Sequence, residues 1–334
     1  MNNPANPVVN TNTDYRSVPE ELIAYHETKA FYCNSAHTLQ EPTAFAVSRS
    51  GTSFIADKKS KKIFVFGIDG KRQPDIPLNA VPFALTVADN ETLYIAFQNR
   101  IDVYSMQDGK IVSSFPLKKA DNITSLSVSD NAVFTVDLTG IICKYNREDG
   151  TLEKTFGGLA KDKTKLTDGR ETENFTGFVI YRSPITLALS PKTGLLYAAN
   201  PGKHRIEVFT PDGHWESALS WGFFSAKIDG FSGCCNPTGI AVLDDGRIIT
   251  AEKAIPRIKI YKPDGTLDSV VAAPKVLETK PENVPEIKGL PQRTAEQNRD
   301  EPPLFAVCGE NNVLVFDTVL RTIRVFEKSL NSAK

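Results

Sequence analysis

Two adjacent cysteines, Cys234 and Cys235, are the most distinctive chemical feature of this chain. Neighbouring thiols can close into a strained vicinal disulfide or offer two soft ligands to a thiophilic metal. Gly230 and Gly233 lie just before the pair and permit the unusual backbone that such a ring needs. The simpler interpretation is a pair of reduced, partly buried cysteines that fill space. We favour the simpler one, because zinc normally takes four ligands and no Cys or His cluster accompanies the pair in sequence.

A second set of polar residues follows short apolar runs that are typical of strands. Carboxylates arranged around a channel could hold Ca²⁺ or Zn²⁺. More often such side chains accept backbone N–H groups of the following turn, and we favour that role. The set comprises Asp57, Asp137, Asn200, Glu252 and Asp317, of which Asp57, Asp137 and Glu252 are the metal candidates.

Basic residues recur in predicted turns and form the third candidate site. Gathered on one face, they could attract an anion such as single-stranded RNA. The net charge of −1 and the lack of interleaved aromatic residues argue against this, so nucleic acid is the less favoured partner. The basic set is Lys58, Lys59, Lys61, Lys62, Arg100, Lys203, His204, Arg205, Lys253, Arg257 and Arg321.

Familiar catalytic motifs are absent from the sequence. It contains no GxSxG elbow, HExxH, P-loop or dinucleotide fingerprint. Of the four histidines, His26 and His214 fall on predicted outer strands, which are poor places for an active site. Cys33 and His37 precede a predicted inner strand, and only the fold could bring them to the cysteine pair.

Composition indicates a globular protein without a transmembrane helix or a disulfide scaffold. No apolar run approaches about 18 residues. Five cysteines in 334 residues are too few, and odd in number, for a disulfide framework. Residues 1–14 are rich in Asn and Pro without an apolar stretch, so we expect a disordered lead-in and no signal peptide there.

A repeat of short strands must position all these residues. Each copy has three apolar runs that end in turn residues, and a weaker fourth run follows an Asp-Gly turn. Six such copies predict an all-β, six-bladed propeller of four-stranded antiparallel blades. The last copy lacks an outer strand, and we expect residues 21–27 to complete it and close the ring. The copies span residues 42–70, 82–109, 123–150, 184–213, 237–265 and 303–326.

The fourth copy resembles the NHL repeat in the segment from Tyr197 to Phe209, which contains Lys-His-Arg-Ile and the strand that follows, and in the Asp-Gly turn after it. The fifth copy, with Cys234-Cys-Asn-Pro and Arg257-Ile-Lys-Ile-Tyr, looks like bacterial, mostly exported NHL proteins without an assigned activity. The resemblance covers the chain beyond Asp14. It implies a propeller and a periplasmic or secreted origin, but no reaction, since fold does not imply function.

Three insertions, at about residues 157–182, 215–235 and 273–302, lead into predicted inner strands. Such connections share the channel-mouth face of a propeller, and loops of this length are often lids or binding loops. The second insertion is aromatic, which suits either a recognition wall or a small local core.

We therefore expect a single propeller over residues 15–334 that acts as a non-catalytic binding or scaffold protein. Its partner would be a protein, a peptide or a small molecule, with no membrane contact, and the chain would be a monomer. One alternative is a metal-dependent hydrolase or lyase with Ca²⁺ or Zn²⁺ in the channel, and the other is RNA binding. The binding candidates are Cys234, Cys235, Asn236, Trp221, Phe223, Phe224, Arg205, His204, Arg257 and Glu252.

Overall fold

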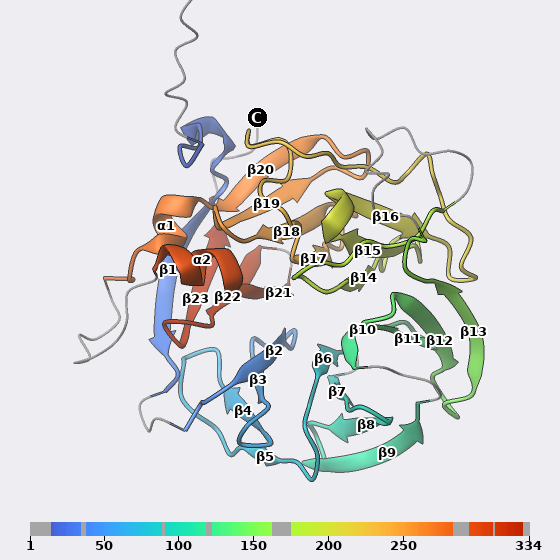
Figure 1. Ribbon diagram of the computed structural model, residues 1–334. Coiled ribbons are helices and arrows are strands. Elements are labelled where there is room, and N and C mark those ends of the chain that lie inside the picture. The colour runs from blue at the N-terminus through green and yellow to red at the C-terminus, as the bar shows by residue number, and fades with distance from the viewer. Residues whose placement is uncertain are drawn as a thin grey trace, which may run out of the picture.

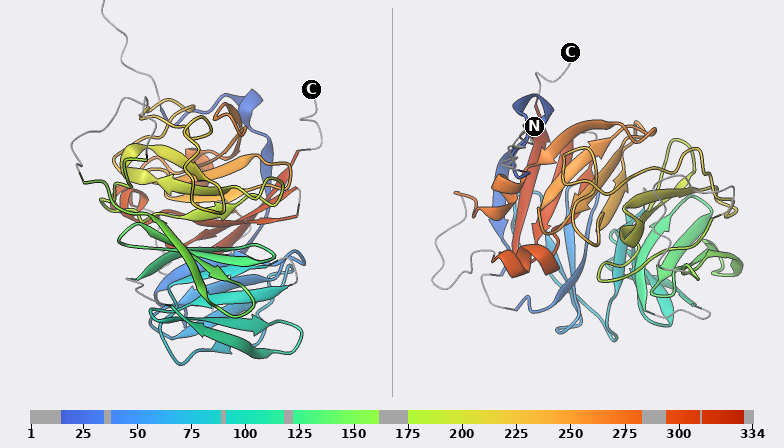
Figure 2. Two further views of the ribbon diagram at one scale, coloured as in Figure 1. Left: turned by 90° about the vertical axis from the view of Figure 1, so that its right-hand side faces the viewer. Right: turned by 45° about the horizontal axis from the view of Figure 1, so that its top comes forward.

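The computed structural model describes residues 15–34, 38–88, 91–117, 122–161, 175–282, 294–309 and 311–329. Over these residues the chain forms six antiparallel sheets arranged in a ring (Figure 1). Turned views show the sheets packed face against face around that ring (Figure 2). This confirms the six-bladed propeller predicted from the repeat. The predicted lead-in, residues 1–14, and His37 lie outside the described residues.

Each blade runs from an inner strand at the channel to an outer strand at the rim. The first three blades are β2 (Pro42–Val47), β3 (Ser53–Asp57), β4 (Lys62–Phe66) and β5 (Ile76–Pro77); β6 (Ala84–Val87), β7 (Thr92–Ala96), β8 (Arg100–Ser105) and β9 (Lys110–Pro116); and β10 (Ile123–Val128), β11 (Ala132–Asp137), β12 (Ile141–Asn146) and β13 (Leu152–Gly157). The fourth and fifth blades are β14 (Leu187–Leu189), β15 (Leu196–Asn200) and β16 (Arg205–Phe209); and β17 (Gly239–Val242), β18 (Ile248–Glu252), β19 (Arg257–Tyr261) and β20 (Leu267–Ala272). The sixth blade combines β21 (Leu304–Cys308), β22 (Asn312–Asp317) and β23 (Thr322–Lys328) with the N-terminal strand β1 (Tyr25–Tyr32).

The N-terminal strand β1 closes the ring by pairing antiparallel with β23, from Tyr25 opposite Lys328 to Tyr32 opposite Thr322. Closure is therefore confirmed, but the closing strand lies further along the chain than residues 21–27. Glu20–Leu22 instead form a short 3-10 helix, η1. The reason is register: β23 begins at Thr322, so its partner must continue to Tyr32 to satisfy the edge.

The fourth blade departs from the four-stranded expectation. Its regular sheet holds only β14, β15 and β16. The outer position is taken by the irregular segment 215–221, which forms isolated bridges from Trp215 to Phe209 and from Trp221 to Ile206. A turn at Glu216, whose carbonyl accepts from the Ser220 amide, interrupts what would be the fourth strand.

Apolar side chains between neighbouring blades form the core. Between the first and last blades, for example, Ile55, Phe64 and Phe316 are completely buried in one cluster. Phe45 and Phe316 place their ring centres 5.8 Å apart across that interface. Burying each such side chain stabilises the fold by about 1.5–3 kcal/mol, which holds the blades together without a shared sheet.

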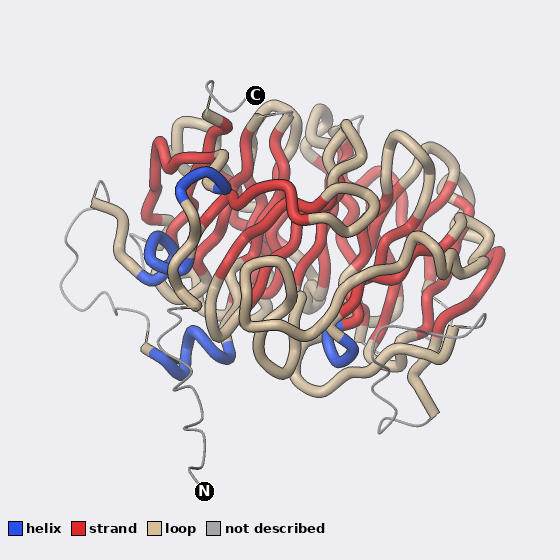
Figure 3. Tube along the Cα trace, turned by 90° about the horizontal axis from the view of Figure 1, so that it is seen from above, coloured by secondary structure: helices blue, strands red, loops and turns tan. Residues whose placement is uncertain are grey.

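Helices contribute little to this fold. The described ones are η1, η2 (Pro201–Lys203), α1 (Pro274–Glu278) and α2 (Ala295–Asp300). Seen from above, the helices are short turns that lie outside the strands of the disc (Figure 3). Within the described residues, no helix has the length and apolar character needed to cross a membrane.

Candidate functional site

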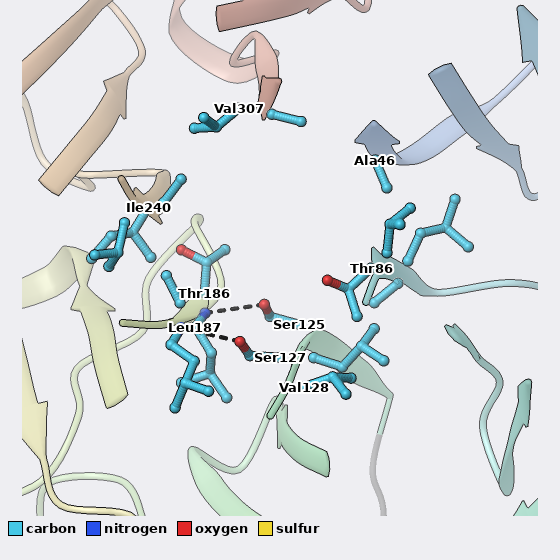
Figure 4. A pocket seen from close by; sticks show the side chains of 18 of the residues that line it. Ala46, Thr86, Ser125, Ser127, Val128, Thr186, Leu187, Ile240 and Val307 are labelled. Atoms are coloured by element: carbon cyan, nitrogen blue, oxygen red, sulfur yellow. Dashed lines mark hydrogen bonds between the residues drawn. The ribbon is translucent and has the colours of Figure 1, made fainter. Parts of the chain in front are cut away.

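The central channel is a cavity of about 720 Å³ lined by the six inner strands (Figure 4). Its wall is neutral, with side chains such as Ala46, Thr86, Ile240 and Val307. Among the described lining residues the charged ones lie in turns that follow inner strands, at one end of the channel. They are Arg49, Asp130 and Asp244.

Hydroxyl groups on the channel wall connect neighbouring inner strands. Ser125 Oγ accepts the Leu187 amide at 3.0 Å, and Ser127 Oγ accepts the Leu189 amide at 3.1 Å (Figure 4). Thr124 donates to the Ile185 carbonyl at 2.8 Å. β14 is the inner edge strand of its sheet, so its backbone groups on that side have no strand partner. The hydroxyls provide hydrogen bonds to these groups and to the segment just before β14, and so they stabilise the ring.

The carboxylates that end the second strands fix turns, as the sequence favoured. Asp57 accepts the amides of Gln40, Glu41 and Ser60 at 2.6–2.8 Å. Asp137 accepts the Thr139 amide and hydroxyl. Both side chains are buried beside the turns that they hold.

The three metal candidates, Asp57, Asp137 and Glu252, lie in three different blades, and none of them lines the channel. The structure does not bring them together, because each is directed to its own turn or loop. Over the described part of the chain, no three His, Cys, Asp or Glu side chains cluster in a way that could hold a metal ion.

Glu252 instead belongs to a fully buried charge network with Arg257 and Lys259. Arg257 Nη2 donates to Glu252 Oε2 at 2.7 Å, and Lys259 Nζ lies 2.7 Å from Glu252 Oε1. Burial opposes ionisation of Glu252, but the charges of Lys259 and Arg257 outweigh it and lower the Glu252 pKa. Burial also lowers the Lys259 pKa to about 8.

This network anchors the loop that leads to the cysteine pair. Lys259 donates to the carbonyls of Ile228 and Gly230 at 3.0 and 2.6 Å. The Tyr261 hydroxyl donates to the Asp229 carbonyl. Lys259 also faces the ring of Phe231 at 5.0 Å. Glu252 provides one negative charge for two buried cations, Arg257 and Lys259. The carbonyl groups and the aromatic ring therefore help to stabilise the positive charge of Lys259.

A related cluster anchors the fourth blade. Glu207 is completely buried, and its carboxylate accepts from Asn200 Nδ2 at 2.9 Å and from Trp215 Nε1 at 3.1 Å. Asn200 Oδ1 accepts the Val179 amide. Arg205 donates to the Ser220 carbonyl. Both the first and second insertions are thus attached to this blade through side chains of β15 and β16.

The exposed cysteine and its neighbouring side chains lie where the insertions meet. Cys234 is exposed, Cys235 is buried, and their free sulfur atoms lie 3.2 Å apart. His204 Nε2 donates to the Gly233 carbonyl at 2.6 Å, since a carbonyl can only accept. The His204 ring packs edge-on against Phe224, and burial lowers the His204 pKa.

The first and third insertions reach the same place. The Cys235 thiol interacts with the backbone amide of Arg182, from the first insertion. Arg182 and Arg299 both pair with Asp300 on α2, at 3.0 and 2.8 Å, in the third insertion. The bond from Arg299 is the main cause that lowers the Asp300 pKa to about 2. The Arg299 pKa is raised by Asp300 and, more weakly, by Cys234.

The aromatic insertion contains both a local core and exposed rings. Trp221 packs against Phe231 and Tyr261, with ring centres 6.0 and 4.6 Å away, and belongs to a local core. Phe223 and Phe224 are 49% and 66% exposed. We call the surface formed by His204, Phe223, Phe224, Cys234 and Arg299 the insertion face.

Several predicted binding residues lie below this surface. Asn236, Glu252 and Arg257 are 0% exposed and Arg205 is 5% exposed, so they support loops and do not face solvent. Cys33 is buried in the core cluster between the first and last blades, which does not include Cys234 or Cys235.

The basic set does not form one exposed surface. Lys203, Arg205, Lys253 and Arg257 are buried, whereas the four lysines of the first blade are exposed. Arg182, Lys259 and Arg299 were not singled out from the sequence. Of these three, only Lys259 could have been identified from the sequence. It alternates with Arg257 and Tyr261 along one strand, so the three side chains share one face of the sheet.

Solved structures are similar to this ring. A selenomethionine-substituted virginiamycin B lyase from Staphylococcus aureus matches with a TM-score of 0.58 and 13% identity, over 91% of this chain and 100% of that one. A protein of unknown function from Bacteroides thetaiotaomicron matches with a TM-score of 0.60 and 14% identity, over 87% of this chain and 70% of that one. No protein-family model and no curated protein sequence matches the chain. These similarities concern the fold alone.

Proposed function

We propose that the protein is a non-catalytic binding propeller that presents its insertion face to a protein, a peptide or a small ligand. The observation that carries the proposal is the convergence of three insertions around exposed aromatic and thiol groups. Buried polar contacts attach the first two insertions to the ring, and the third meets the first through the exposed Arg182–Asp300 ion pair. A surface of fixed loops with exposed aromatic side chains is typical of recognition sites.

The chemistry of the face supports binding over metal-dependent hydrolysis or elimination. The acidic side chains that a cation would need are used by backbone amides, hydroxyls, Arg257 and Lys259. The channel wall offers mainly hydroxyl and apolar groups, and its carboxylates, Asp130 and Asp244, lie in turns at one end. One structurally similar protein is a lyase, but 13% identity carries only the fold to this chain.

The NHL-like fourth and fifth repeats are consistent with this proposal. Both contribute to the insertion face, through His204 and the loop before β17. The exported NHL-type propellers that the chain resembles suggest that it meets its partner in the periplasm or outside the cell.

A selection from displayed random peptides tests the proposal, with the wild-type chain as bait. The test variant is F223S/F224S, which removes the exposed aromatic pair of the insertion face. The matched control is I111S/V112S, which removes two exposed apolar side chains on β9. We expect enriched peptides to bind the test variant about 5–30-fold more weakly, as loss of aromatic contacts of ~1–2 kcal/mol predicts, and to bind the control unchanged.

Equal binding of the enriched peptides to both variants, or no enrichment, would overturn the proposal. Metal analysis of the dialysed wild-type chain tests the enzymatic alternative. Stoichiometric Ca²⁺ or Zn²⁺ that survives dialysis would favour a metal-dependent enzyme over the binding propeller.

A further inference from the structure

Cys234 differs from the other cysteines in its access to solvent. The structure describes all five cysteines of the chain, and only Cys234 is exposed. Cys33, Cys143 and Cys308 are buried, and burial raises the pKa of each thiol, that of Cys33 to about 12. A thiol reacts as the thiolate, so an exposed cysteine is the one that external reagents attack first.

Cationic side chains lie near the pair, together with the Asp300 carboxylate that binds Arg182 and Arg299. Arg299 interacts electrostatically with Cys234, and Lys253 with Cys235. Burial and the neighbouring Cys234 raise the Cys235 pKa, while the Arg182 amide and Lys253 act in the opposite direction. Positive groups favour thiolates, and a second thiol at 3.2 Å can resolve any bond that Cys234 forms.

The pair also lacks the further ligands of a zinc site, because the described residues contain no cluster of three His, Cys, Asp or Glu side chains. Gly233, with φ of +72°, precedes the pair and gives the loop a conformation that other residues rarely adopt. Two thiols with one exposed, one buried and no third ligand suit disulfide exchange better than metal coordination.

We propose that Cys234 and Cys235 form a thiol–disulfide exchange site for low-molecular-weight disulfides of the glutathione class, in which Cys234 attacks and Cys235 resolves. This inference is independent of the binding proposal, because exchange is measured without any other ligand.

The reaction proceeds in two displacements. The Cys234 thiolate attacks one sulfur of the small disulfide, whose S–S bond breaks and releases one thiolate. Cys235 then gives up its proton and attacks Cys234 Sγ, which releases the second small thiolate and leaves a Cys234–Cys235 disulfide. In total the two protein thiols lose two electrons and two protons, and the small disulfide becomes two thiols.

Intact-mass measurement of the full chain after incubation with oxidised glutathione tests the site. We expect the wild type to become lighter by two hydrogens without a stable adduct. C235S should retain one glutathione on Cys234, because the resolving thiol is gone, and C234S should remain unmodified. The tryptic peptide 228–247 contains both residues and locates each product.

The buried cysteines are internal controls, and circular dichroism checks that the variants fold. Wild-type protein that keeps a stable glutathione adduct would overturn the proposal. So would C234S that reacts as fast as the wild type, or wild type that stays fully reduced while C235S also forms no adduct.

Discussion

The Lys259 ammonium lies 2.7 Å from Glu252 Oε1, with neither side chain exposed to solvent. Through this contact a carboxylate that ends one strand and a lysine within the next hold the loop that carries Asp229 and Phe231. The loop positions the exposed cysteine, so the properties of the insertion face depend on a buried ion pair.

We expect Glu252→Gln to destabilise the protein by about 3–5 kcal/mol, because it leaves Arg257 and Lys259 as buried cations without a counter-ion. Urea unfolding of wild type and variant measures this difference. Glu41→Gln is the matched control, since Glu41 forms an exposed ion pair with Lys58 and should cost less than about 1 kcal/mol. Similar losses for the two variants would contradict a central role for Glu252.

The pH dependence of stability should report Lys259. Burial lowers its pKa from 10.5 to about 8, so between these values the unfolded chain binds more protons than the folded one at this site. The Lys259 contribution to the free energy of unfolding therefore rises with pH from about 8 to 10, by roughly 1 kcal/mol per unit, and is level below 8.

Urea unfolding between pH 7 and 10 compares the wild type with Lys259→Met. The wild-type free energy minus that of the variant should increase with pH over this range. A constant difference would show that Lys259 keeps an ordinary pKa in the folded protein. The comparison stops at pH 10 because burial raises the Tyr261 pKa, so its titration opposes the effect above that value.

Ring closure by β1 should be essential for stability. Ala30 lies opposite Arg324 in the middle of the β1–β23 pairing. Ala30→Pro disturbs a strand that must pair along its length, and we expect a loss of roughly 2–3 kcal/mol and a tendency to aggregate through the β23 edge. Ala30→Ser keeps the backbone donors and should change stability by less than about 1 kcal/mol. Thermal unfolding and light scattering measure both effects.

Arg299 should accelerate the reaction of Cys234. Its guanidinium, on α2, interacts electrostatically with Cys234 and would favour a negative charge developing there, so Arg299→Glu should slow the second-order reaction with a small disulfide by roughly 3–10-fold at low salt. Lys71→Glu makes the same charge change in an exposed turn of the first blade and should leave the rate unchanged. Equal rates for Arg299→Glu and the wild type would show that α2 does not influence Cys234.

Several features of the ring could be predicted from neighbouring residues in the sequence. Alternating apolar runs that end in turn residues, repeated six times, predicted the blades, because a strand side chain needs an apolar partner on each buried face. The carboxylate role at Asp57 and Asp137 was also predictable, since each accepts amides of an adjacent turn or of the loop entering the same blade.

The extent of the closing strand and the missing outer strand of the fourth blade were not predictable in this way. Register between β1 and β23 joins residues about 300 positions apart, and no local pattern specifies it. The aromatic residues of segment 215–221 are compatible with a strand, but packing of Trp215 and Trp221 into different blade interfaces favours an irregular path.

The sequence alone determined the all-β class, the number of blades and the chemical distinctiveness of Cys234 and Cys235, because each of these depends on residue types at short separations. Only the tertiary structure decided which candidates face solvent. It buried Glu252, Arg257 and Asn236, exposed Phe223 and Phe224, and brought Arg182 and Arg299 to the cysteines. The physical reason is that burial and electrostatic environment come from segments that meet only when the ring closes and the insertions fold over it.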